Sequence, residues 1–98
     1  MWVDLLPLAA REAQAARRWY ARNAGQSVAN RFMIALDAAK TQIEFSPRMW
    51  PPHLYGTRSC RLKRFPYHLV YIEEPNSVLI VAVAHFRRRP GYWKRRMP

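Results

Sequence analysis

The sequence contains little of several residue types on which common functional sites depend. Its 98 residues include one cysteine and three glycines. Cys60 alone excludes an internal disulfide and a cysteine-based zinc site, and its place in an alternating stretch predicts a buried thiol. Because the glycines are isolated from one another, the chain has no Gly-rich phosphate-binding loop. The longest apolar run, residues 78–84, is too short to cross a bilayer as a helix.

Acidic residues and histidines are also too few or too scattered to form an evident catalytic or metal site. The chain has six acidic residues, of which Glu73 and Glu74 adjoin a predicted turn, where solvent is expected. The three histidines, His53, His68 and His85, fall in different predicted elements, and none has metal-ligand spacing. We therefore expect no metal and no cofactor. The N-terminal residues lack the apolar stretch of a signal peptide, so we expect a cytoplasmic protein without a membrane partner.

What the chain does have is positive charge and apolar content. Seventeen Lys and Arg face six Asp and Glu, a formal net charge of +11, and ten of these cations lie from Arg58 onward. Such a field attracts nucleic acid, an acidic protein or an anionic membrane surface. Half of the residues are hydrophobic, so residues 1–98 are expected to form one domain. A core of this size is thin, and a stabilising acidic partner is therefore expected.

Two amphipathic helices are predicted in the first half of the chain. Pro7 suits the first turn of a helix, and the Ala- and Arg-rich segment behind it favours helix up to about Gly25. Ser27 is predicted to be the N-cap of the second helix, which ends before Pro47. The short connection predicts an antiparallel helical hairpin. The apolar stripe of the second helix consists of Val28, Phe32, Ala35, Leu36, Ala39 and Ile43.

Strands are predicted at both ends of the chain. Residues 2–6 are predicted to form an edge strand, and residues 57–65 alternate between basic and apolar side chains, with Ser59 outside the pattern. Residues 67–74 and 78–86 are rich in β-branched and aromatic residues and flank a tight turn, which predicts a hairpin with the last strand in the centre of the sheet. The order β-α-α-β-β-β predicts an α+β fold, in which the helical hairpin covers one face of a mainly antiparallel sheet. The residues predicted to face the helices from the sheet are Leu69, Tyr71, Val81 and Val83.

The basic residues of the later strands predict a charged sheet face opposite the helices. Such a face fits RNA cleavage without a metal. The 2′-OH attacks the adjacent phosphate, Arg and Lys stabilise the charged transition state, and His or Tyr moves protons. The alternative is a solvated face of a basic protein. If the protein is a ribonuclease, the predicted catalytic residues are Arg61, Lys63, His68, Arg88 and Tyr92.

The C-terminal segment, residues 86–98, combines cations with two large aromatic residues. Arginine forks and aromatic faces bind phosphates, bases and acidic protein surfaces, which predicts a working surface. In the alternative, Tyr92 and Trp93 fold back and cap the core. The residues predicted to bind a target or partner are Arg58, Arg87, Arg89, Trp93, Lys94, Arg95 and Arg96.

An ordered set of segments covers nearly the whole chain: "LLPLAAREAQAARRWY", "ANRFMIALDAAKTQIEFSP", a Trp-Pro loop, "GTRSCRLKRFPYHLVY" and "VLIVAVAHFRRRPGYWKRR". Together they resemble the RelE/ParE superfamily of bacterial type II toxins, known from plasmid stabilisation systems. The resemblance implies the fold predicted above and a growth-inhibiting toxin. It also implies a cognate antitoxin whose acidic or amphipathic segment wraps the toxin. Operator DNA would be bound only through the toxin–antitoxin complex.

Members of the superfamily differ in the target on which they act. RelE-like members cut messenger RNA in the ribosome, and ParE-like members poison DNA gyrase without a nuclease site. Arg61, Lys63 and Tyr92 match basic and tyrosine positions of a RelE-like site, but His68 and Phe86 stand where such enzymes carry arginines. The ending "AVAHFRR" is more similar to ParE-type sequences. The resemblance therefore favours gyrase as the target. The alternatives are a ribosome-dependent endoribonuclease and a relic that binds only antitoxin and operator.

Overall fold

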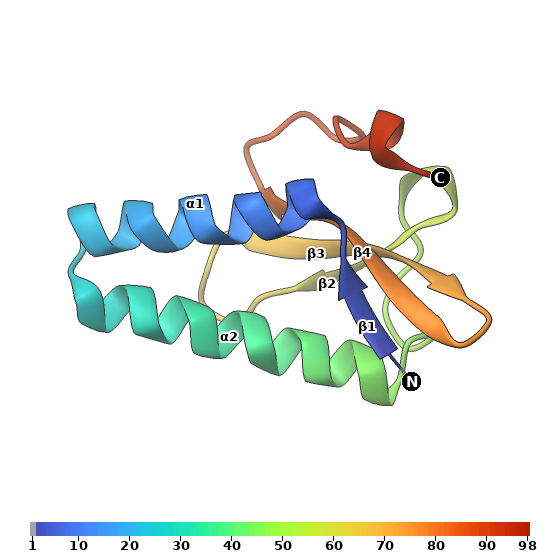
Figure 1. Cartoon of the computed structure of the whole chain (residues 1–98), viewed down its shortest axis with the longest axis horizontal. Coiled ribbons are helices and arrows are strands. Elements are labelled where there is room, and N and C mark those ends of the chain that lie inside the picture. The colour runs from blue at the N-terminus through green and yellow to red at the C-terminus, as the bar shows by residue number, and fades with distance from the viewer. Residues whose placement is uncertain (1) are drawn as a thin grey trace.

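The helices and strands of the computed structural model follow the predicted β-α-α-β-β-β order (Figure 1). The structure describes residues 2–98. Its elements are β1 (Trp2–Leu5), α1 (Pro7–Asn23), α2 (Gln26–Phe45), η1 (Leu54–Gly56), β2 (Arg58–Arg61), β3 (Tyr67–Glu74), β4 (Ser77–His85) and η2 (Lys94–Arg96). No helix within residues 2–98 is long and apolar enough to cross a membrane.

The helical hairpin turns at Gly25. α1 begins at Pro7, where the missing N–H costs no hydrogen bond. Gly25 has a φ of 98°, a conformation that glycine adopts without a steric penalty, and its carbonyl accepts two bonds of 3.2 Å from the first turn of α2. α2 therefore begins at Gln26, and the prediction that Ser27 is its N-cap was wrong.

The sheet has the strand order β1-β4-β3-β2. β1 runs parallel to β4 at one edge, and the β2–β3 and β3–β4 pairs are antiparallel. β4 lies inside the sheet, as its apolar sequence predicted. The β1–β4 pairing ends where Leu5 meets Ile80, and Leu6 adds one bond from its N–H to the Ile80 carbonyl at 3.0 Å. Beyond this point, β1 supplies no partner to β4.

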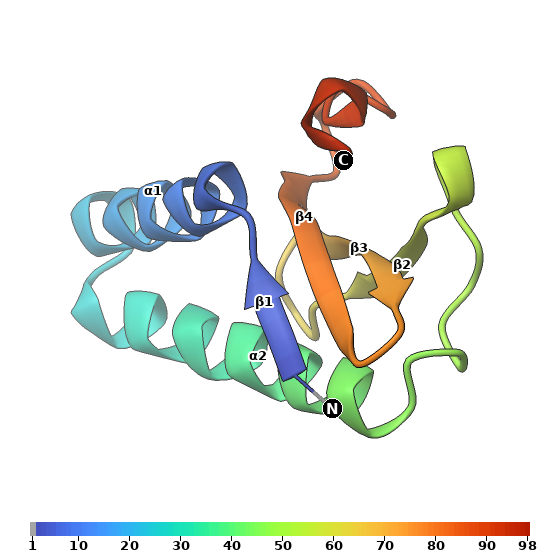
Figure 2. The ribbon, with the colours of Figure 1, turned by 45° about the vertical axis from the view of Figure 1, so that its right-hand side comes forward.

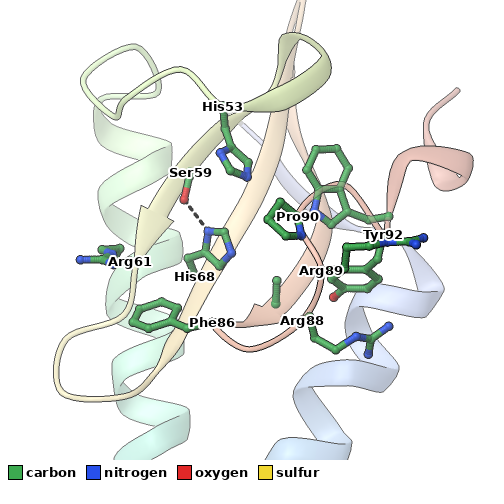
Figure 3. A pocket seen from close by; sticks show the side chains of 11 residues that line it. His53, Ser59, Arg61, His68, Phe86, Arg88, Arg89, Pro90 and Tyr92 are labelled. Atoms are coloured by element: carbon green, nitrogen blue, oxygen red, sulfur yellow. Dashed lines mark hydrogen bonds between the residues drawn. The ribbon is translucent and has the colours of Figure 1, made fainter.

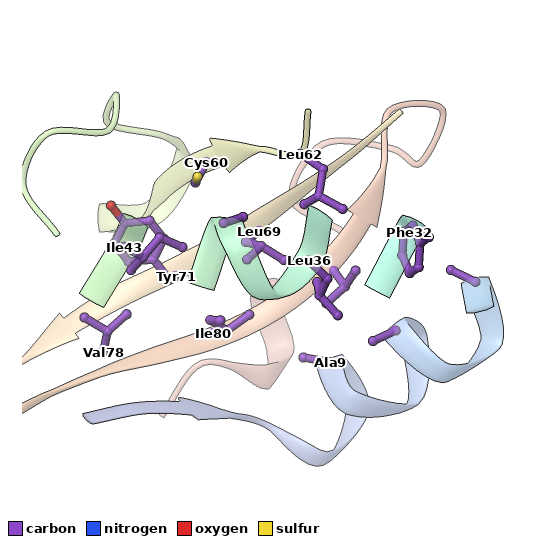
Figure 4. Packing of buried hydrophobic residues seen from close by; sticks show 14 residues of the cluster. Ala9, Phe32, Leu36, Ile43, Cys60, Leu62, Leu69, Tyr71, Val78 and Ile80 are labelled. Atoms are coloured by element: carbon purple, nitrogen blue, oxygen red, sulfur yellow. The ribbon is translucent and has the colours of Figure 1, made fainter. Parts of the chain in front are cut away.

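The main core lies between the helical hairpin and the sheet (Figure 4). Phe32, Leu36 and Ile43 of α2 are buried there, as the helical spacing predicted. The same cluster contains Leu69 and Tyr71 of β3. Full burial of an apolar side chain of this size contributes about 1.5–3 kcal/mol. This stripe is therefore the main contact that holds α2 on the sheet.

One irregularity in β4 moves Val81 to the opposite face of the sheet. Val70 pairs with Ala82, whereas the next residue of β3, Tyr71, pairs with Ile80, so Val81 has no partner in the register. A bulge of this kind inserts one residue and shifts the side-chain alternation. Val81 packs in a second, smaller cluster away from the helices. The prediction that it faces the helices was wrong for this reason.

The C-terminal segment folds back on the side of the sheet away from the helices (Figure 2). Trp93 is only 1% exposed and packs in the second cluster with Val70, Val81 and Ala84. The ring of Tyr55, in η1, meets the Trp93 ring edge-on at a centroid distance of 5.9 Å. The segment thus closes a small second core. The alternative prediction, in which Trp93 folds back on the core, is confirmed.

Candidate functional site

A pocket of about 280 Å³ opens on the face of the sheet away from the helices (Figure 3). Its wall contains four of the predicted catalytic residues, Arg61, His68, Arg88 and Tyr92. These residues come from β2, from β3 and from the segment that follows β4. The fold therefore brings together side chains that are distant in the sequence. We call this site the basic pocket.

The pairing of β2 with β3 sets one wall of the basic pocket. In the antiparallel register, Arg61 lies opposite His68, and Ser59 lies opposite Val70. Side chains alternate along a strand, so Ser59 and Arg61 point to the pocket while Cys60 between them is buried in the main core. Strand alternation thus places a thiol inside and two polar groups on the pocket face.

His68 is a neutral hydrogen-bonding group in this pocket. Its Nδ1 lies 2.5 Å from the Ser59 hydroxyl oxygen, and Figure 3 shows the two side chains facing each other. Burial, followed by the neighbouring His53 and Arg61, lowers the pKa of His68 from 6.5 to about 4. The ring is therefore uncharged at neutral pH. It can accept or donate a hydrogen bond, but it adds no cation to the site.

Two guanidinium groups lie on aromatic rings at the edge of the pocket. The Arg61 guanidinium is 4.6 Å from the centre of the Phe86 ring, and that of Arg88 is 3.8 Å from the centre of the Tyr92 ring. Both arginines are exposed, and neither belongs to an ion pair found within residues 2–98. The basic pocket therefore offers unpaired forked donors, with aromatic surface beside them, to an anionic group.

Glu12 of α1 connects this region to the C-terminal segment. Its carboxylate accepts a bond of 2.5 Å from the Tyr92 hydroxyl and one of 3.0 Å from the Val83 N–H. The Arg96 guanidinium donates to both carboxylate oxygens, at 2.7 and 3.0 Å, and to the Val81 carbonyl at 3.2 Å. These backbone groups lie beyond the end of the β1–β4 pairing. Glu12 and Arg96 thus satisfy polar groups of β4 that β1 does not reach.

The Tyr92 hydroxyl keeps its proton in this arrangement. Burial, and then the hydrogen bond to Glu12, raises the pKa of Tyr92 well above its ordinary value of 10. A general acid or base works best when its pKa is near the operating pH. The geometry therefore makes the hydroxyl a contact that holds the segment, and the proton-carrying role of Tyr92 stays a prediction.

Two residues predicted to lie along β2 are outside the basic pocket. Arg58 lies opposite Tyr71, on the helix-facing side of β2, and donates from Nη1 to the Trp50 carbonyl at 2.6 Å. Lys63 comes after the end of β2 and lines a separate groove beside α2. The sequence suggested one row of cations along β2, but the strand ends at Arg61 and the chain turns away.

The predicted binding residues of the C-terminal segment divide into two groups. Trp93 is buried, and Arg96 is held by Glu12 with only 15% of its side chain exposed, so neither is a free surface residue. The prediction that they form part of an open tail is corrected by this packing. The remaining members, Arg87, Arg89, Lys94 and Arg95, are exposed.

Sequence reasoning missed three residues of this region. Ser59 and His53 line the basic pocket, but a serine in a strand and a histidine in a Pro-rich loop carry no distinctive signal. Glu12 did carry a sequence signal, because at helical spacing it lies within the buried stripe of Ala9, Ala13 and Ala16. A single acid on the buried side of a helix predicts a paired charge.

The chain is similar to known proteins in sequence and in fold. Residues 3–90 match the model of a family described as ParE toxin of type II toxin-antitoxin system, parDE. A solved structure described as the chromosomal ParDE TA system from P. aeruginosa is similar, with a TM-score of 0.77 and 15% sequence identity. The similarity covers 87% of this chain and 95% of that chain, and at this identity it bears on the fold alone. No curated protein matches the sequence.

Proposed function

The chain belongs to the ParE toxin family of type II toxin-antitoxin systems, and from this premise we propose that it inhibits growth by binding DNA gyrase and is neutralised by an acidic cognate antitoxin. The observation that carries the proposal is the family match over residues 3–90. The match includes both helices, β2, β3 and β4, all of β1 except Trp2, and the first residues of the C-terminal segment. The proposed site of action is the cytoplasm.

The geometry of the basic pocket favours binding over RNA cleavage. Of the five residues that a RelE-like nuclease would use, Lys63 lies in another groove and the Tyr92 hydroxyl is bonded to Glu12. Arg61 and Arg88 are left as unpaired cations. We propose that they, with the exposed cations that follow β4, bind acidic groups of the target. Binding of this kind needs charge complementarity and no proton transfer.

One observation favours the alternative, a ribosome-dependent messenger RNA endoribonuclease. The neutral His68 imidazole and the Ser59 hydroxyl lie beside Arg61 in the same pocket. A neutral imidazole is able to take a proton from a 2′-OH, although the lowered pKa of His68 makes it a weak base. The two functions therefore have to be separated by their products in cells.

The antitoxin is the partner that the charge of the chain supports best. The net charge of +11 destabilises the isolated domain by self-repulsion, and an acidic partner relieves it. A partner that binds only the folded chain also raises its stability by mass action. We propose that operator DNA is bound only by the complex.

The two targets are distinguished by inducing the protein in a bacterial host that carries a reporter plasmid. Plasmid supercoiling and double-strand breaks are measured together with cleavage of a ribosome-bound message. We expect loss of negative supercoiling and breaks before any change in the message. Early cleavage of messages with normal supercoiling would replace the gyrase proposal with the nuclease alternative. Normal growth on induction of the folded protein would contradict both.

A further inference from the structure

Another hollow opens where the second half of α1 approaches the start of β3 and the end of β4, and it shares no lining residue with the basic pocket. Its volume is about 630 Å³, which is within the usual range for ligand sites. Four aromatic rings, one proline and one cation line it, namely Trp19, Tyr20, Pro66, Tyr67, His85 and Arg87. We call this surface the aromatic groove.

The rings of the aromatic groove hold one another in place. Tyr67 and His85 lie opposite each other in the β3–β4 register, and their rings meet edge-on with centroids 5.0 Å apart. The Tyr20 ring meets the Tyr67 ring at 6.4 Å and the Trp19 ring at 5.3 Å, again edge-on. The groove is therefore formed before any ligand binds, and a preformed site loses little conformational entropy on binding.

Trp19 is the ring of this groove that is most open to solvent, with 53% of the residue exposed. Tyr20 and Tyr67, by contrast, are partly buried and pack against the main core. An indole that is so exposed adds little to the core, whereas its face is able to stack on a flat ligand. The groove thus has a floor anchored in the core and one open stacking surface.

The aromatic groove also offers polar donors and positive charge. The backbone N–H of Arg87 donates to His85 Nδ1 at 3.0 Å, so this nitrogen carries no proton and Nε2 is the donor of the ring. The Arg87 side chain is exposed and belongs to neither of the ion pairs found within residues 2–98. Its guanidinium is a free forked donor of the kind that binds phosphate. The groove therefore suits a flat ring that adjoins an anionic group.

A smaller hollow of about 240 Å³ connects the aromatic groove with the basic pocket. It shares Trp19, Tyr67 and His85 with the aromatic groove, and Arg88 and Tyr92 with the basic pocket. The three hollows therefore form one continuous path, and each part of the path is lined by an exposed arginine.

We propose that this path binds single-stranded nucleic acid, with an unstacked base on Trp19 and the adjoining phosphates on Arg87 and Arg88. Aromatic faces and cations along a common path are the means by which proteins hold single strands without reading their sequence. A double helix keeps its bases stacked and paired, so it has no free base face to offer the groove, and the operator is not the ligand. The proposal goes beyond the proposed function and does not depend on it.

Charge and shape argue against other occupants. A second copy of the chain carries the same +11 charge, and like charges placed opposite each other oppose association. An acidic peptide would pair with Arg87 but would bring no flat base to the exposed face of Trp19. A free mononucleotide would fill the aromatic groove and leave the rest of the path empty. A strand of bases and phosphates is the occupant that uses the whole path.

The test measures the fluorescence anisotropy of labelled strands of about ten nucleotides on addition of the full chain. One strand contains deoxyuridine, one contains uridine, and one is an abasic deoxyribose phosphate strand with the same charge and no bases. At physiological ionic strength, we expect both strands with bases to bind at least about tenfold more tightly than the abasic strand. Tighter binding of the DNA strand would indicate opened DNA as the source of the ligand, and tighter binding of the RNA strand would indicate a message.

Two tryptophan variants locate the base. Trp19→Ala removes the open ring of the groove, whereas Trp2→Ala removes a ring that is 75% exposed on β1 and lines no part of the path. We expect Trp19→Ala to weaken the deoxyuridine strand at least about tenfold and to leave the abasic strand unchanged, with Trp2→Ala within about twofold of wild type. Trp19→Phe keeps a stacking face and should recover part of the affinity. Circular dichroism checks that the variants fold.

Arg87→Ala tests the phosphate contact separately from the base. It should weaken the deoxyuridine and abasic strands alike, because both carry the same phosphates. Loss of one phosphate contact to a single strand should also reduce the slope of log affinity against log salt concentration by about 0.7. An unchanged slope would contradict the placement of a phosphate on Arg87.

Other results would overturn the proposal as a whole. These are equal affinity for the abasic and deoxyuridine strands, equal affinity of Trp19→Ala and Trp2→Ala for the deoxyuridine strand, and a dimer of the wild-type chain that Trp19→Ala dissociates. Binding of a duplex, of deoxyuridine monophosphate or of a polyglutamate peptide as tight as that of the deoxyuridine strand would also overturn it. A chain that inhibits gyrase but binds no strand contradicts this proposal alone, whereas groove-specific strand binding by a chain without effect on gyrase contradicts only the gyrase proposal.

Discussion

The carboxylate of Glu12 and the guanidinium of Arg96 form an ion pair of 2.7 Å between the first helix and the C-terminal segment, 84 residues apart in the sequence. Both side chains are mostly buried, at 16% and 15% exposed. The pair also bonds the backbone of β4 at Val83 and Val81. It therefore fixes the segment that carries Tyr92 and the exposed cations of the proposed binding surface.

Glu12→Ala removes four hydrogen bonds and leaves Arg96 without its partner. Loss of one member of a buried pair typically costs about 3–5 kcal/mol. We expect a decrease of this size in the free energy of unfolding, measured with urea. Glu44→Ala, at an exposed position of α2, is the matched control and should change stability by less than about 0.5 kcal/mol. Equal stability of the two variants would show that the ion pair does not hold the fold.

Because the C-terminal segment is packed against the fold, its surface has to be tested by point substitutions and not by deletion. Removal of residues 93–98 would expose the second core, because Trp93 is buried there. The triple variant Arg89→Ala, Lys94→Ala, Arg95→Ala changes only exposed side chains. We expect it to fold normally, by circular dichroism, and to lose most of its toxicity in a growth assay.

The control for that variant removes three exposed cations of α1, in Arg11→Ala, Arg18→Ala, Arg22→Ala. It changes the net charge by the same amount at another surface. We expect it to remain toxic. If both triple variants lose toxicity equally, total charge and not the C-terminal surface is responsible.

Phe32→Ala tests the packing of α2 on the sheet. Phe32 is fully buried, and truncation of a buried Phe costs about 3–5 kcal/mol. We expect a loss of this size in urea unfolding. Phe45→Ala removes the same ring from a residue that is 89% exposed and should have little effect. A Phe32→Ala chain with wild-type stability would contradict the position of α2.

His68 gives the stability of the domain a pH dependence. Its pKa is about 4 in the folded chain and 6.5 when it is exposed. Between these values the unfolded chain binds more protons, so stability is full above pH 6.5 and falls as the pH falls toward 4. The loss at this site is at most about 3 kcal/mol. In denaturant titrations between pH 4 and pH 7, His68→Gln should flatten this slope, and an unchanged profile would contradict the assignment.

The fold was predictable because it follows from regular sequence patterns. The site was only partly predictable, because it depends on single contacts between residues. The α2 stripe is a repeated signal, and it correctly predicted that Phe32, Leu36, Ala39 and Ile43 are buried, whereas Val28 and Ala35 are half-buried. The face of Val81 was not predictable, because the bulge in β4 arises from its pairing with β3. The position of Lys63 was missed because the alternation of the sequence continues past the end of β2.

The clustering of cations was predicted from composition, but its details were not. A cluster of cations and aromatic residues predicts a surface that binds anions, and the structure places Arg61 and Arg88 at one pocket. The sequence did not reveal that Glu12 draws Arg96 inward, because the two lie at opposite ends of the chain. Long-range pairs of single residues leave no periodic trace.

The most direct test of the gyrase proposal is a supercoiling assay with purified gyrase, comparing the wild-type chain with Tyr92→Phe. The substitution removes only the hydroxyl that bonds Glu12, and its ring remains beneath Arg88. We expect both proteins to inhibit supercoiling with similar potency, and neither to cut messenger RNA on purified ribosomes. Unaffected gyrase, with message cleavage by the wild type that Tyr92→Phe abolishes, would contradict the proposal and establish a nuclease instead.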